Sequence, residues 1–454
     1  MVECLHDMDV IKIERSRLVM KGIKKINRII LFIFVMIAAF CLCHDDAYDS
    51  IVPWALEFIR LTKQGQMFEF YTFTHGVGVY NLMIILIVAL WMLPFHLFIK
   101  VVGISYNIAF YVMWYKILLI CALFLSCDMF RKCLIKIGFK KEKSDLGVLM
   151  FAVSPMVLLG NIGMGQVDII ATYFVIFSIY CVLDEKDTIA FALLSIAVSM
   201  KYFAIILIIP YILLKEKNIY KIIKNIFICT IIPIIVEFVS GLDPYYSNTK
   251  NDMTNRLIEV NFNFVSLFLL TVFALFIISY YIKIDNNNRW CEVALPALTY
   301  IMFLLFVMFH PQWVVYFLPL FIIMTLSLKN EEFALLLFVG TSIGYVLYII
   351  CVWSTSVTNY MINKSLICFL TGISYNGPYL QELIHVWNGE TGKSMMMACV
   401  LMIIAIFVYE KTRNDKSEEV VSYSGIEKIK QEILFIPSGV FLLSTLILFF
   451  IYRE

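Results

Sequence analysis

Long apolar runs follow one another from near the start of the chain to near its end, and this feature restricts the fold most. A helix needs about 20 mostly apolar residues to cross the hydrocarbon core of a bilayer. Only 15% of the residues are charged, against roughly 25% in soluble domains. We therefore predict an all-α polytopic membrane protein of roughly 11–13 transmembrane helices. The clearest candidate spans are 29–43, 104–127, 146–160, 167–183, 222–241, 264–284, 291–309, 313–328, 332–353, 394–410 and 433–452.

Two further segments decide the topology. Residues 82–99 carry Pro94 and His96 near one end, and residues 188–214 place Lys201 at their middle. Most of the 36 Lys and Arg residues fall on one side if 82–99 is re-entrant or interfacial and 188–214 is a helical hairpin. Because cytoplasmic loops concentrate Lys and Arg, we expect this arrangement. It places the N-terminus and 411–432 in the cytoplasm, and it places Glu454 and the loops 44–81, 242–263 and 354–393 outside.

Composition excludes several other classes of protein. The net charge is +2, so the chain has no basic field for nucleic acid. Its 12 cysteines form no CxxC pair and no Cys/His spacing typical of a metal site. No Pro-rich or Gly/Ser-rich linker divides the chain, so we expect a single membrane domain over 1–454.

Three carboxylates gather directly after the first span, at Asp45, Asp46 and Asp49. They either end the helix in a solvated loop, or they supply a general base or ligands for a divalent cation such as Mg²⁺ or Mn²⁺. The residues after them repeat apolar side chains at helical spacing, which predicts an amphipathic juxtamembrane helix at the interface. This helix would hold the acids near headgroup depth. Its apolar stripe is Ile51, Trp54, Ala55, Phe58 and Ile59.

Three polar turns are expected on the same side as these acids. The glycine-rich turn 160–168 presents Gln166 and Asp168, although Asp168 alone would also suit the N-cap of the next helix. Lys201 either snorkels or offers a cation to an anion. His310 and Gln312 flank Pro311 at a turn between two spans, where a lone histidine is often only structural. Together these turns and the acids suit attack of a hydroxyl on a lipid-linked phosphate ester.

The order of these elements resembles the GT-C superfamily of integral membrane glycosyltransferases, which use polyprenyl-phosphate sugars. The likeness is to GPI-mannosyltransferase-like enzymes and their bacterial relatives. It rests on Gly165-Gln166-Val167-Asp168, on the hairpin at Lys201 and on the late turn FHPQWVVYFLPLF. It covers roughly residues 29–328, so 329–454 would add C-terminal transmembrane helices. The chain departs from the family at 74–80, which lacks a Tyr-Pro-Pro element, at Phe203 in place of proline, and in acids that read DDxxD rather than DxD.

The resemblance implies a GT-C-like helical bundle and an inverting transfer of a hexose such as mannose. The donor would be a polyprenyl-phosphate sugar and the acceptor a glycolipid or cell-surface glycan, at the non-cytoplasmic face of a bacterial plasma membrane. Asp45 or Asp46 would be the base and Asp49 a weaker candidate. Two other readings stay open, a transporter or flippase and a polymerase of polyprenyl-linked polysaccharide intermediates. The residues implied to bind the donor phosphate or the substrate are Gln166, Asp168, Lys201, Arg256, His310 and Gln312.

Overall fold

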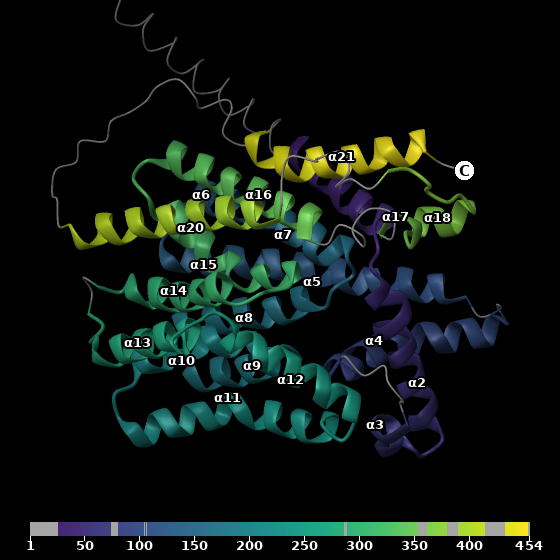
Figure 1. Cartoon of the computed structure of the whole chain (residues 1–454), viewed down its shortest axis with the longest axis horizontal. Helices are drawn as coiled ribbons and strands as arrows, with labels where there is room; N and C mark the ends of the chain where they lie inside the picture. The colour runs from purple at the N-terminus through teal and green to yellow at the C-terminus, as the bar shows by residue number, and fades with distance from the viewer. Residues whose placement is uncertain are drawn as a thin grey trace, which may run out of the picture.

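The computed structural model describes residues 26–73, 80–103, 105, 107–285, 288–352, 361–378, 389–413 and 432–452. Within these ranges the chain is almost entirely helical (Figure 1), and its two short strands pair antiparallel. The prediction of an all-α fold is confirmed. The α-helices and strands are Ile26–Cys41, α2 (Val52–Lys63), α3 (Phe70–Phe73), α4 (Leu82–Val102), α5 (Ile108–Ile137), α6 (Lys141–Val153), α7 (Pro155–Val157), α8 (Asp168–Leu183), α9 (Asp187–Met200), α10 (Ile205–Lys215), α11 (Ile219–Ser240), α12 (Pro244–Glu259), β1 (Asn261–Phe262), β2 (Val265–Ser266), α13 (Leu267–Tyr281), α14 (Cys291–Phe306), α15 (Leu318–Ser327), α16 (Glu331–Val352), α17 (Met361–Asn363), α18 (Leu366–Thr371), α20 (Gly389–Thr412) and α21 (Ile436–Ile451).

Six of the described helices are long and apolar enough to cross a membrane, which makes the chain a multi-pass membrane protein. Two bent pairs would raise that number to 8 if each pair is one span. The first pair bends by 64° between Cys41 and Asp46, so Asp46 lies beyond the end of the first helix. Six shorter apolar helices of 10–17 residues complete the bundle. The N-terminus, most of 411–432, the element 74–79 and Glu454, for which topology or family likeness was predicted, lie outside the described residues.

Residues 82–99 form part of one continuous helix, α4, and not a re-entrant turn. Asn81 caps its start, and Gly103 ends it in a left-handed conformation. The helix pairs antiparallel with the first half of α5, because Trp91 and Trp114 each donate an indole hydrogen bond of 2.9 Å to the other's carbonyl. The opposite end of α5, at Lys136, contacts Asp184 instead. The turn after α4 therefore lies at the end of α5 that is remote from Lys136.

Residues 188–214 divide into two helices at Lys201, as predicted. The backbone of Lys201 is extended, with φ −147° and ψ 119°, and this interrupts the helix between α9 and α10. The short 3-10 turn Tyr202–Ala204 reverses the direction. Asp187 begins α9 near the turn that carries Asp184, and Lys215 ends α10 in an ion pair with Glu292. Lys201 consequently lies at the apex of the hairpin, far from both of these ends.

The predicted amphipathic helix after the first span is present as α2, preceded by the π-helical turn Asp46–Ile51. Its buried face includes Trp54, Ala55 and Phe58. The expectation that this face meets lipid needs correction, because it packs against α4 and against Phe70, whose ring lies 5.3 Å from that of Trp54. The helix positions the acids through protein contacts.

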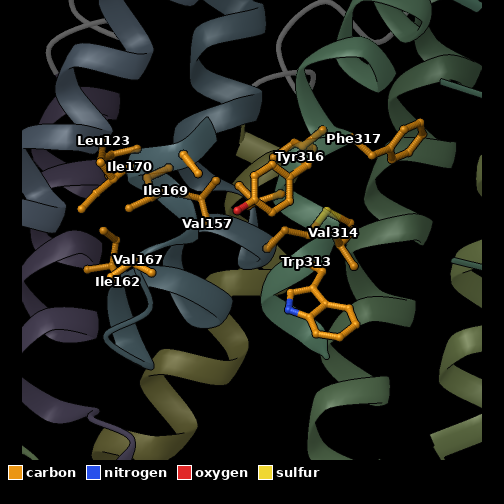
Figure 2. Packing of buried hydrophobic residues seen from close by; sticks show 14 of the residues in the cluster. Leu123, Val157, Ile162, Val167, Ile169, Ile170, Trp313, Val314, Tyr316 and Phe317 are labelled. Atoms are coloured by element: carbon orange, nitrogen blue, oxygen red, sulfur yellow. The ribbon is translucent and has the colours of Figure 1, made fainter. Parts of the chain in front are cut away.

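Two π-helical turns occur in the described chain, at Asp46–Ile51 and Leu158–Gly163. Such turns are rare in proteins overall, and those that occur are often found at functional sites. The second turn follows α7 and packs with α8 against the 3-10 helix Pro311–Tyr316, which precedes α15. Figure 2 shows this core, with Val157 and Ile169 on one side and Tyr316 on the other, and with the Tyr316 hydroxyl directed toward them. The fold thus joins two of the predicted polar turns, the glycine-rich turn and the turn at Gln312, in one buried layer.

The C-terminal helices pack around the same bundle. α16 and α20 lie in close contact, because a Cβ on Gly344 would come within 2.5 Å of the backbone nitrogen of Met396. Small residues allow this approach between membrane helices. The remaining 3-10 helix Glu432–Phe435 leads into α21, and Phe435 contacts Phe34 of the first helix with 5.8 Å between ring centroids. The first and last described helices therefore lie side by side, as Figure 1 also shows.

Candidate active site

The three acids of the first outer loop face different surroundings. Asp46 Oδ2 accepts a hydrogen bond of 2.7 Å from Gln166 Nε2, so it lies at the predicted polar turn. Asp49 is 57% exposed and pairs instead with Lys364 at 3.6 Å. One oxygen of Asp45 is buried without a hydrogen bond from any described residue, and the Lys364 charge also acts on it. Of the three, Asp46 is the carboxylate that joins the other predicted site residues.

The close approach of Gln166 to Asp46 depends on Gly165. This glycine has φ +73°, a conformation that L side chains rarely adopt. A Cβ at this position would also lie 3.2 Å from the Cβ of Ala47, next to Asp46. The glycine-rich turn therefore lets two backbones meet closely enough for an amide to hold the carboxylate.

Two consecutive residues of α5, Tyr115 and Lys116, hold this junction together, and neither was predicted as a site residue. Lys116 is 2% exposed, and its ammonium donates to the carbonyl of Leu42 and, at 3.1 Å, to that of Gly163. The Tyr115 hydroxyl donates to the carbonyl of Gly165 at 2.9 Å. A buried ammonium with these two carbonyl partners ties the segment before Asp46 to the turn before Gln166.

Asp168 and Lys201 lie beyond Gln166 and interact electrostatically. Asp168 is fully buried, and the nearby Tyr316 hydroxyl interacts with its carboxyl group. It does not cap α8, whose N-cap is Val167. Lys201 Nζ lies 5.1 Å from the ring centroid of Tyr80, and the Tyr80 hydroxyl lies 3.4 Å from Gln166 Oε1. This Tyr80 contact links the lysine to the Asp46–Gln166 pair.

Arg256 and His310 form the opposite edge of the cluster. Arg256, on α12, donates from Nη1 to His310 Nε2 at 3.1 Å. The charges of Lys201 and Asp46 also act on the His310 imidazole, so His310 lies close enough to both side chains to belong to the same cluster. Gln312 is buried in the adjoining 3-10 helix, and its Oε1 has no hydrogen bond from the described residues.

Protonation states follow from these contacts. Burial alone would raise the pKa of the Asp46 carboxyl, but His44 and hydrogen bonds from Gln166 and Tyr80 lower it to about 2. Burial opposes protonation of His44, yet the adjacent Asp46 carboxylate outweighs it and raises the imidazole pKa. Burial and the charge of Arg256 lower the pKa of His310 to about 4. At neutral pH Asp46 is therefore ionised, and His310 is neutral and able to accept from Arg256.

A cavity of about 400 Å³ opens beside this cluster. Tyr80 and Lys201 line it on the side of the polar cluster, and Lys250 and Tyr202 line another part of it. Lys250 and Tyr202 both bond to Glu237, so the Lys250 charge is compensated, whereas Lys201 has no ion-pair partner among the described residues. The other walls are largely apolar and include Ile84, Ile205, Ile206, Leu257 and Phe268. The cavity thus combines an apolar interior with a lysine that forms no ion pair with any described residue.

The described residues contain no group of three or more His, Cys, Asp or Glu side chains that could hold a metal ion. The acids predicted as alternative ligands for Mg²⁺ or Mn²⁺ diverge, because Asp46 faces Gln166 and Asp49 faces Lys364. The need for a divalent cation stays a prediction that this geometry does not support.

Fold and site together define a class, a multi-pass membrane protein in which a lysine lines an apolar cavity next to a cluster that contains an ionised carboxylate. The chain belongs to glycosyltransferase family 87, whose family model matches residues 86–337, more than half of its length. It is therefore a glycosyltransferase, consistent with the GT-C type that its sequence resembles. The match covers Gln166, Asp168, Lys201, Arg256 and His310 but begins after Asp46. No curated protein and no solved structure matches the chain.

Proposed function

We propose that this glycosyltransferase moves a hexose from a polyprenyl-phosphate donor to a hydroxyl of a glycolipid or cell-surface glycan, with inversion. The reaction would take place at the non-cytoplasmic face of a bacterial plasma membrane. One observation carries the proposal: Lys201, which has no ion-pair partner among the described residues, lines an apolar cavity, and Tyr80 links it to the Gln166 that holds the ionised Asp46. Such a donor has an anionic head and an isoprenoid tail, so it complements both parts of this arrangement.

The donor phosphate would lie near Lys201 and the Arg256–His310 pair. Lys201 supplies a positive charge that no described carboxylate neutralises through an ion pair, and Arg256 keeps its charge because His310 is neutral. Cations held at the leaving group stabilise the negative charge that develops there. Asp168, which is buried and interacts with Lys201, would accept hydrogen bonds from the hydroxyls of the sugar.

The acceptor hydroxyl would attack the anomeric carbon from the face opposite the phosphate. The new bond joins the hydroxyl oxygen to that carbon, while the bond from the carbon to the phosphate oxygen breaks and its electron pair leaves on polyprenyl phosphate. The hydroxyl proton passes to Asp46 Oδ2. Because the pKa of Asp46 is about 2, the carboxylate is a weak base and would accept the proton only as the attack proceeds.

Replacement of Asp46 tests the base. Asp46→Asn keeps the size of the side chain but removes the proton acceptor, so turnover should fall at least about 100-fold. The assay is the transfer of radiolabelled mannose or glucose from undecaprenyl-phosphate sugar in membranes that contain the full chain. Asp49→Asn, on the same turn but paired with Lys364, is the matched control and should retain activity within about twofold. Full activity of Asp46→Asn would refute the assignment.

The donor class needs its own test. Purified protein in nanodiscs should transfer sugar from undecaprenyl-phosphate mannose or glucose and not from GDP-mannose or UDP-glucose. The nucleotide donors carry the same sugars without the isoprenoid tail that the apolar cavity would accommodate. Equal use of a nucleotide sugar would overturn the lipid donor while leaving the role of Asp46 as base intact.

A further inference from the structure

A second cavity lies at the end of the bundle opposite the candidate active site. It measures about 310 Å³ and is enclosed by α5, α8, α10, α14, α15 and α20, with one residue from α9. α8 begins with Asp168 at the active site and reaches the cavity through Val175, Ser178 and Val182. At 1.5 Å per residue these positions lie about 10–21 Å along the helix from Asp168. The cavity is therefore separate from the active site.

The interior of this cavity is apolar and its rim is aromatic. Val175, Leu194 and Ile208 are among the aliphatic side chains of the walls. Trp290 and Phe407 pack edge to face at the rim, with 6.1 Å between their ring centroids. Tryptophan is enriched where a membrane meets water. The rim therefore suits headgroup depth, and the interior suits a hydrocarbon chain.

The charges at the rim leave an excess of cations. Lys136 is neutralised by Asp184, and Glu292 is neutralised by Lys215 at 2.9 Å. Arg289 and Lys411 also line the cavity, and within the described ranges neither has an acidic partner at ion-pair distance. Lys411 Nζ instead lies 5.7 Å from the ring centroid of Phe407. Two uncompensated positive charges thus border an apolar space.

We propose that this cavity binds an anionic glycerophospholipid, with its phosphate between Arg289 and Lys411 and an acyl chain among the apolar walls. Basic pockets between membrane helices on the cytoplasmic side bind anionic headgroups. The short loops at the end of the bundle that holds this cavity contain many Lys and Arg residues. The positive-inside rule therefore predicts that this end faces the cytoplasm. A zwitterionic lipid would bring a cation of its own to the two side chains, and inorganic phosphate would leave the apolar interior unfilled.

Native mass spectrometry of the full chain in detergent tests this site. We expect dioleoyl-phosphatidylglycerol to be retained and dioleoyl-phosphatidylcholine to be lost. Arg289→Gln/Lys411→Gln should weaken phosphatidylglycerol binding about 30-fold, since each cation contributes roughly fivefold. The matched control is Lys132→Gln/Lys221→Gln, which removes two lysines that are 52% and 67% exposed and do not line the cavity. It should change binding by less than about threefold.

A second variant keeps the result decisive if the charge variant folds poorly. Val293→Trp would fill part of the apolar wall and should abolish retention of phosphatidylglycerol while both cations remain. Millimolar inorganic phosphate should not displace the lipid. Equal retention of the two lipids, unchanged binding in both variants, or displacement by phosphate alone would each overturn the proposal.

Discussion

The two ends of the bundle treat charge in opposite ways. At the end remote from Asp46, acids and bases mostly neutralise one another, as in Arg131–Asp145 at 2.8 Å and Lys143–Glu331 at 2.6 Å. The exceptions there include Arg289 and Lys411, which border the second cavity. At the active-site end, Lys201 has no ion-pair partner among the described residues, and the buried Asp168 interacts with it without forming an ion pair.

This difference separates structural charges from functional ones. A charge that is paired within the protein is already neutralised by its partner and has little attraction left for a ligand. An exposed pair also adds little to the stability of the fold. An unpaired charge beside an apolar cavity costs stability unless a ligand compensates it. The charges to alter first are therefore those that the fold leaves without partners, together with the groups that hold them in place.

The largest contrast is expected between two lysines of α5. Lys116→Met removes the ammonium that joins the Leu42 and Gly163 carbonyls, so Asp46 and Gln166 should separate. A misplacement of about 1 Å can reduce a rate about 100-fold, and we expect a loss of that size in kcat with little change in donor KM. Lys136→Met at the other end should stay within about twofold of the wild type.

Lys116→Gln supplies the discriminating control. Its amide can still donate to a carbonyl, so it should recover part of the lost kcat, which a merely destabilised protein would not do. Wild-type kcat in Lys116→Met would remove this lysine from the positioning of the site.

A smaller effect, on binding, is expected at Lys201. Lys201→Met should raise the KM for the polyprenyl-phosphate donor about 10–100-fold, the range for loss of a hydrogen bond to a charged group. Expression should be unchanged, because Lys201 is only partly buried.

The double variant Lys201→Met/Asp168→Asn distinguishes two possible partners of the Lys201 side chain, the donor phosphate and Asp168. If Lys201 binds the donor phosphate, the double variant stays impaired. Restored activity would mean that Lys201 only neutralises Asp168, and the phosphate role would pass to Arg256 or His310.

Asp145→Asn makes at the opposite end the same chemical change as Asp46→Asn. It breaks the ion pair between Asp145 and Arg131. The side chain of Arg131 is 37% exposed and that of Asp145 is 31% exposed. Activity should remain within about twofold, and the apparent melting temperature in detergent should fall by about 1–2 °C. A loss of activity comparable to that of Asp46→Asn would erase the proposed division between the two ends.

The smallest effect concerns pH. The folded-state pKa of His44 is raised by Asp46, so this pair stabilises the protein fully below the unfolded pKa of about 6.5. The stabilisation disappears as the pH rises through the folded pKa. The melting temperature of the wild type should therefore exceed that of His44→Gln by about 1–2 °C at pH 6, with a smaller difference at pH 8.5. A difference that grows with pH would contradict the assignment.

Much of the fold was readable from local sequence. Apolar runs predicted helices of membrane-spanning type, and the break at Lys201 followed from a charge that is costly at the bilayer centre. The polar turns at Gln166 and His310 were also found, because glycine and proline interrupt helices locally. The amphipathic stripe of α2 was read correctly as a helix, but its partner was not lipid. Periodicity shows which face is apolar and does not show what covers it.

The sequence by itself determined that this chain is a polytopic helical membrane protein. It also showed that several turns between the helices carry acidic, basic and amide side chains of the kinds found in active sites. Only the tertiary structure decided which of Asp45, Asp46 and Asp49 meets Gln166, because that choice depends on a π-helical turn and on the left-handed Gly165. It also assigned Lys116 to the junction of the site, since an isolated lysine in an apolar helix does not specify its carbonyl partners. Helix formation is governed by neighbours along the chain. The contacts Lys116–Gly163 and Asp46–Gln166, by contrast, join residues that are separated by 47 and 120 positions in the sequence. Packing alone brings such residues together.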